Sequence, residues 1–86
     1  MEYIIAFKNT NYAIKAEQCL LEQKLRVGVL PLPSQISAGC GICLRVKMDE
    51  IKPALEILAG KNIPEAGVFL RVEENNRYIY TEAVEE

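Results

Sequence analysis

The stretch Tyr3-Ile4-Ile5-Ala6-Phe7 is short, apolar and rich in aromatic and β-branched residues. Such residues favour extended backbone, so the segment from Glu2 to Lys8 is predicted to be a β-strand. A strand with one solvated face alternates apolar and polar residues, whereas this stretch is apolar almost continuously. We therefore expect a central strand that is covered on both faces.

The rest of the chain alternates helical and strand-like patterns around this strand. After the first strand we expect a helix from 12 to 24 or 25 and strands over 26–30 and 41–48. A second helix is expected from its cap Asp49 to Ala59, followed by Gly60. A strand over 66–73, a tight turn at 74–77 and a strand over 77–81 complete the chain. This β-α-β-β-α-β order predicts an α+β sandwich of ferredoxin-like topology, in which both helices cover one face of an antiparallel sheet. The last strand extends it by a C-terminal hairpin. Residues 1–82 are expected to form a single domain, and 83–86 an acidic, frayed tail.

Composition excludes several classes of function. The chain has 86 residues, of which 50% are hydrophobic, and this is enough for one domain with its own core. The net charge of -2 does not suggest a nucleic-acid surface, and no apolar run is long enough for a membrane helix. We recognise no secretion signal, so we expect a cytoplasmic protein with reduced cysteines. The absence of histidine excludes Cys-His pairs and His-ligated zinc within one chain, and no cofactor is expected.

One loop is the candidate for a reactive site: Pro31-Leu32-Pro33-Ser34-Gln35-Ile36-Ser37-Ala38-Gly39-Cys40-Gly41-Ile42-Cys43. Two prolines stiffen its entrance, and two glycines flank Cys40. A thiol between glycines has little cover, so we expect a partner to reach it. The alternative is an ordinary turn in which Cys40 is a small apolar filler.

The predicted topology gives Cys40 a position. The loop after the second strand and the turn into the first helix lie at the same end of the sheet. A helix N-terminus carries about half a positive charge and stabilises thiolates. The residues expected to stabilise an anion there are Ser37, Gly39 and Gly41 of the loop and Asn9, Thr10 and Asn11 at the helix start.

Cys43 forms a C-x-x-C spacing with Cys40, which is compatible with redox or metal chemistry. The pair leads into a strand instead of opening a helix, and it supplies half of a four-cysteine zinc site, so metal would require two chains. No metal site is predicted. Cys43 is a candidate resolving thiol that would close a disulfide onto Cys40, although a partly covered strand cysteine is the preferred interpretation. Cys19, in the first helix, is interpreted as core filler.

The sheet face without helices is expected to be open and to carry Cys43, Arg45, Lys47, Phe69 and Arg71. Such a face is either solvated or a surface for a partner or a second copy. The alternative function is therefore a noncatalytic regulatory or interaction domain, which forms a homodimer or binds another protein.

A family resemblance joins several of these segments. They are Tyr3-Ile4-Ile5-Ala6-Phe7, the helix with Ala13 and Ala16, Val29-Leu30-Pro31-Leu32-Pro33, Ile36-Ser37 and Cys40-Gly41. In these residues the chain resembles small bacterial selenium/sulfur carrier-like proteins, formerly a domain of unknown function.

The resemblance implies that Cys40 is the carrier thiol, which holds sulfur as a persulfide or selenium in the analogous form. A carrier of this type would need a cysteine desulfurase-like donor and an acceptor protein. It would be a shuttle between partner proteins more than a stand-alone enzyme.

Overall fold

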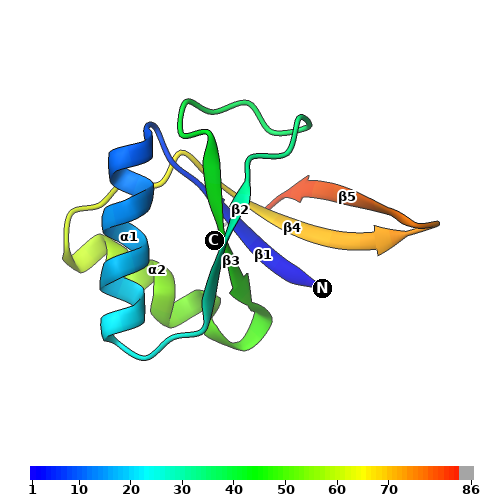
Figure 1. Ribbon diagram of the computed structural model, residues 1–86. Coiled ribbons are helices and arrows are strands. Elements are labelled where there is room, and N and C mark those ends of the chain that lie inside the picture. Colours follow the sequence, from blue (N-terminus) through cyan, green and yellow to red (C-terminus); the bar gives the residue numbers. More distant parts are fainter. Residues whose placement is uncertain (84–86) are drawn as a thin grey trace.

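β1 (Glu2–Ala6) lies at the centre of a five-stranded antiparallel sheet in the computed structural model, which describes residues 1–83 (Figure 1). It pairs with β3 (Ile42–Lys47) on one side and with β4 (Gly67–Glu74) on the other. β2 (Val27–Pro31) and β5 (Arg77–Glu82) form the edges, so the strand order is β2-β3-β1-β4-β5. Ile4 and Ile5, which point to opposite faces, are both fully buried. The prediction of a central strand covered on both faces is confirmed.

Both helices cover one face of the sheet (Figure 1). α1 (Thr10–Glu22) buries Ala13, Ala16 and Leu20, and α2 (Ile51–Gly60) buries Ala54 and Leu58. The small alanines allow close approach to the sheet, where Leu44 and Val46 of β3 are fully buried. The predicted α+β class, with two helices on an antiparallel sheet and a C-terminal hairpin, is confirmed.

The helix starts differ from the predictions. Asn9 caps α1 by accepting a hydrogen bond from the Tyr12 backbone N–H at 2.9 Å, so the helix begins at Thr10, not at Tyr12. Asp49 does not cap α2. It lies in a short 3₁₀ turn (Met48–Glu50), where its carboxylate is 3.5 Å from Nη2 of Arg26.

The turns follow the sequence closely. Asn75 and Asn76 connect β4 to β5 with φ angles of 53° and 63°, and both therefore occupy the left-handed region that asparagine tolerates. The chain leaves α2 through Asn62, with φ of 59°, and not through Gly60, which lies inside the helix. Of the predicted tail, Ala83 donates a backbone hydrogen bond to Val68 at 2.7 Å, and residues 84–86 lie outside the described part of the chain.

The face away from the helices is less open than expected. Ala6 pairs in register with Cys43 and Gly67, and both Ala6 and Cys43 are buried on this face. Ile36 of the loop between β2 and β3 joins the same buried cluster, and Phe69 packs against it. The loop therefore closes part of a face that the sequence suggested was free.

Arg71 closes another part of that face. Its side chain donates to Oε1 of Glu2, with an Nε–Oε1 distance of 3.0 Å, and its guanidinium carbon lies 4.2 Å from the centroid of the Tyr78 ring. Arg71 is only 9% exposed as a result. The ion pair ties the start of β1 to the hairpin.

We predict that this ion pair makes stability depend on acid pH. The hydrogen bond from Arg71 lowers the pKa of Glu2 below its ordinary value of 4.5. A lowered pKa in the folded state adds stability above the unfolded pKa, and that stability is lost as the pH falls through the folded value. Glu2→Gln should lower the free energy of unfolding at pH 7 by about 1–2 kcal/mol. Urea unfolding from pH 7 to pH 3 measures it.

The exposed Glu22→Gln variant is the matched control. It should keep the stability of the parent at pH 7 and the decline below about pH 4.5. If the free energy of unfolding of Glu2→Gln falls with acid as steeply as that of this control, Glu2 is not the group responsible for the pH dependence.

Candidate functional site

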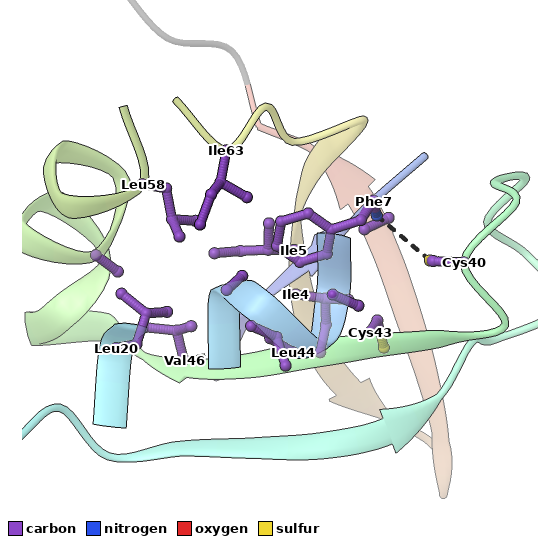
Figure 2. Close-up of a cluster of buried hydrophobic side chains, with 14 of the residues drawn as sticks. Ile4, Ile5, Phe7, Leu20, Cys40, Cys43, Leu44, Val46, Leu58 and Ile63 are labelled. Carbon is purple, nitrogen blue, oxygen red and sulfur yellow. Dashed lines mark hydrogen bonds between the residues drawn. The ribbon is translucent and has the colours of Figure 1, made fainter. Parts of the chain in front are cut away.

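Cys40 lies at the end of the loop that leads into β3, and it is fully buried. The expectation of an accessible thiol is therefore wrong for this conformation. The sulfur points toward the backbone of Phe7, the residue that follows β1, as Figure 2 shows, and Cys40 belongs to the same buried cluster as Ile36 and Cys43. Apolar neighbours cover the sulfur that the flanking glycines leave bare.

Two hydrogen bonds hold Cys40 beside the start of α1. The backbone N–H of Phe7 donates to Sγ of Cys40 at 3.3 Å, and the hydroxyl of Thr10 donates to its carbonyl oxygen at 2.8 Å. The topology predicted this neighbourhood. The sulfur thus accepts a hydrogen bond from a backbone N–H two residues before the N-cap of α1.

The two glycines have structural roles that differ from the one expected. A Cβ atom at Gly39 would lie 2.5 Å from the backbone oxygen of Lys8, which is closer than real contacts allow. Gly41 has φ of +68°, in the left-handed region that side chains disfavour. The glycines bring the loop against the junction of β1 and α1 and turn the chain into β3, instead of leaving room around the sulfur.

The other predicted residues separate into two groups. Asn9 and Thr10 lie at the site, where Asn9 caps the helix and Thr10 binds the Cys40 carbonyl. Asn11 and Ser37 are exposed, and within residues 1–83 no hydrogen bond joins their side chains to Cys40. Their role in stabilising an anion stays a prediction.

Sequence reasoning missed the two backbone groups that meet the loop, the N–H of Phe7 and the carbonyl of Lys8. Main-chain groups carry no side-chain signature in the sequence. Only the pair of glycines near Cys40 indicated that the loop backbone packs closely against another segment.

Cys43 is buried on the opposite side of β3 from the helices, with its sulfur 3.8 Å from the backbone oxygen of Pro31. The pKa of Cys43 is raised to about 11, mainly by burial and to a lesser extent by the neighbouring Cys40, while Arg71 partly opposes both effects. The thiol is therefore protonated near neutral pH and is a poor nucleophile. Its assignment as a resolving thiol stays a prediction.

Within residues 1–83, no cluster of three or more His, Cys, Asp or Glu side chains is placed to hold a metal ion. In the same part of the chain, no helix combines the length and apolar character needed to cross a bilayer. Cys19 is half-buried on α1 and packs against the core, in agreement with its interpretation as filler.

We predict that the three thiols differ in reactivity. With iodoacetamide at pH 8 in the native state, Cys19 should be alkylated first, because Cys40 and Cys43 are fully buried. Cys43 should be the slowest, since its pKa of about 11 leaves only about one thiolate in a thousand at that pH. Peptide mass spectrometry over a time course measures each rate. Faster labelling of Cys43 than of Cys19 would contradict the assignment, and in 8 M urea the differences should largely disappear.

We predict that Gly39 is intolerant of a side chain. Gly39→Ala places a methyl group against the Lys8 carbonyl, so the loop must shift, at a cost of about 1–3 kcal/mol in unfolding free energy. Urea denaturation measures this cost. Gly60→Ala is the matched control, because nothing lies within 4 Å of the added Cβ and the residue is helical. Gly60→Ala should be neutral or stabilise by about 0.5–1 kcal/mol. Equal stability of the two variants would show that the loop is not held close to Lys8.

Neither the curated proteins nor the solved structures include a significant match. A family model described as "Putative Se/S carrier protein-like" matches residues 2–70. The matched region runs from β1 into β4, and it contains the loop with Cys40 and the start of α1. The chain belongs to this Se/S carrier-like family.

Proposed function

We propose that the protein carries sulfur or selenium on Cys40, as a persulfide or the selenium analogue. Membership of the Se/S carrier-like family supports the general role. The observation that supports this choice of residue is the hydrogen bond from the Phe7 backbone N–H to the Cys40 sulfur. A donor directed at sulfur stabilises an anionic form, and the adjacent start of α1 adds favourable potential. Neither Cys19 nor Cys43 has a comparable setting in the described residues.

The transfer is a thiolate exchange. The thiolate of Cys40 attacks the outer sulfur of a persulfide on the donor protein. A new sulfur–sulfur bond forms on Cys40 as the bond in the donor persulfide breaks, and the donor cysteine leaves as a thiolate. The same exchange in the next step passes the outer sulfur to an acceptor thiolate and restores Cys40.

The donor is a cysteine desulfurase-like enzyme, the acceptor is a second protein, and both act with the carrier in the cytoplasm. The ferredoxin-like topology belongs to the proposal as well, and the order β2-β3-β1-β4 with β5 added at one edge supports it. The protein is then a shuttle whose turnover is completed by the acceptor.

We predict that Cys40 accepts one sulfur atom. The reduced protein is incubated with a cysteine desulfurase and cysteine, and its intact mass is measured before and after addition of a reductant. The parent should gain the mass of one sulfur, which the reductant removes. Cys40→Ser should gain none, because the attacking thiolate is absent. Cys19→Ser is the matched control, and it should load like the parent, since Cys19 lies on α1 away from the loop.

Loading that persists in Cys40→Ser would contradict the choice of residue. No loading under conditions that load an established carrier would favour the interaction domain. For that alternative, the supporting observation is the exposure of Tyr78 (46%) and Ile79 (39%) on the edge strand β5, where a partner or a second copy can pair.

A further inference from the structure

Burial of Cys40 sets a requirement for any transfer at this sulfur. A persulfide exchange needs the attacking and attacked sulfurs in line, whereas Cys40 is fully buried. Transfer at Cys40 therefore requires a second conformation in which this thiol is exposed.

The body of the protein next to Cys40 is firmly held. β1, which leads to Phe7, is paired on both sides along its length. Beyond it, Asn9 caps the start of α1, where its side-chain oxygen accepts a hydrogen bond from the Tyr12 N–H. Strands and capped helix ends of this kind open only at high cost, so movement on this side is unfavourable.

The loop side is held by fewer interactions. In the described part of the chain, two hydrogen bonds join residues 32–41 to the junction of β1 and α1, one from Phe7 to the Cys40 sulfur and one from Thr10 to the Cys40 carbonyl. The other backbone hydrogen bonds of the loop join residues of the loop to one another. One of them, from the Leu32 N–H to the Gly41 carbonyl oxygen at 3.1 Å, closes the neck of the loop, where its two ends meet. Apart from Cys40, Ile36 is the buried apolar residue of this segment, with 4% of its surface exposed, and Leu32 and Ala38 pack against the same cluster while only partly buried. A long loop with one fully buried apolar side chain besides the thiol, and otherwise partly exposed contacts, favours local opening.

We propose that residues 33–40 form a gate that exposes Cys40 by local opening, and that the Thr10 hydroxyl is its latch. The neck bond from Leu32 to Gly41 stays closed while the segment between them lifts away from Lys8 and Thr10. The closed gate shields the thiol from reagents in solution, and the open gate presents it to a partner. The gate regulates the proposed carrier site, and in that respect it rests on the proposed function.

The test follows alkylation of Cys40 in the full chain at pH 8, by peptide mass spectrometry, with increasing urea below the unfolding transition. Local opening exposes little surface, so the Cys40 rate should depend weakly on urea, whereas labelling through global unfolding rises steeply. Thr10→Val removes the hydroxyl but keeps the branched shape. It should speed Cys40 labelling about fivefold to tenfold, as expected for one hydrogen bond lost from the closed state.

Thr10→Ser is the matched control, because it retains a hydroxyl, and it should label at nearly the parent rate. Each rate is compared with the global stability of the same variant from urea unfolding. The proposal is overturned if Cys40 labels with the urea dependence of global unfolding in every variant. It is also overturned if Thr10→Val labels no faster than Thr10→Ser.

Sulfur loading of the same variants separates the gate from the carrier. If Thr10→Val accelerates alkylation but no variant accepts sulfur, the gate is supported and the carrier function fails. If every variant accepts sulfur, and the loading rate is the same with each residue at position 10, the carrier function is supported and the gate is overturned.

Discussion

The close approach of the loop backbone to the junction of β1 and α1 is the constraint on which the site depends. The Lys8 carbonyl occupies the space where any other residue at position 39 would place its Cβ. With that contact made, the next residue brings its sulfur to the Phe7 N–H and its carbonyl to the Thr10 hydroxyl. Gly41 then turns the chain, through a conformation costly for other residues, into the register of β3. A glycine on each side of Cys40 thus determines where its sulfur lies.

Much of the fold was predictable, because local patterns and tertiary packing agree in this chain. The apolar stretch of β1 indicated a strand covered on both faces, and Asn75-Asn76 indicated a tight hairpin turn. The errors occur where two plausible signals competed. Asp49 follows the preference of acidic residues for helix starts, but it lies in a 3₁₀ turn ahead of α2, where its carboxylate faces Arg26 and caps no helix.

The candidate site was predictable in place but not in accessibility. Topology located Cys40 beside the first helix, since loop ends are fixed by strand order. Exposure of a sulfur depends instead on which distant side chains cover it. Here Ile36 folds inward, and the loop and Arg71 close parts of the face opposite the helices. Neither effect has a periodic signal in the sequence, because each depends on contacts formed after the sheet is assembled.

The position of β1 has a consequence for synthesis of the chain on the ribosome. This strand emerges before both of its neighbours, and its pairing with β4 joins residues as far apart as Glu2 and Arg71, 69 positions away. Until β3 and β4 have been translated, the most apolar strand has no partner for its backbone groups. Folding must therefore await closure of long stretches of chain, which slows it relative to a helical bundle of the same size. During that interval the nascent strand exposes apolar side chains and unpaired backbone groups, which are the features that chaperones bind.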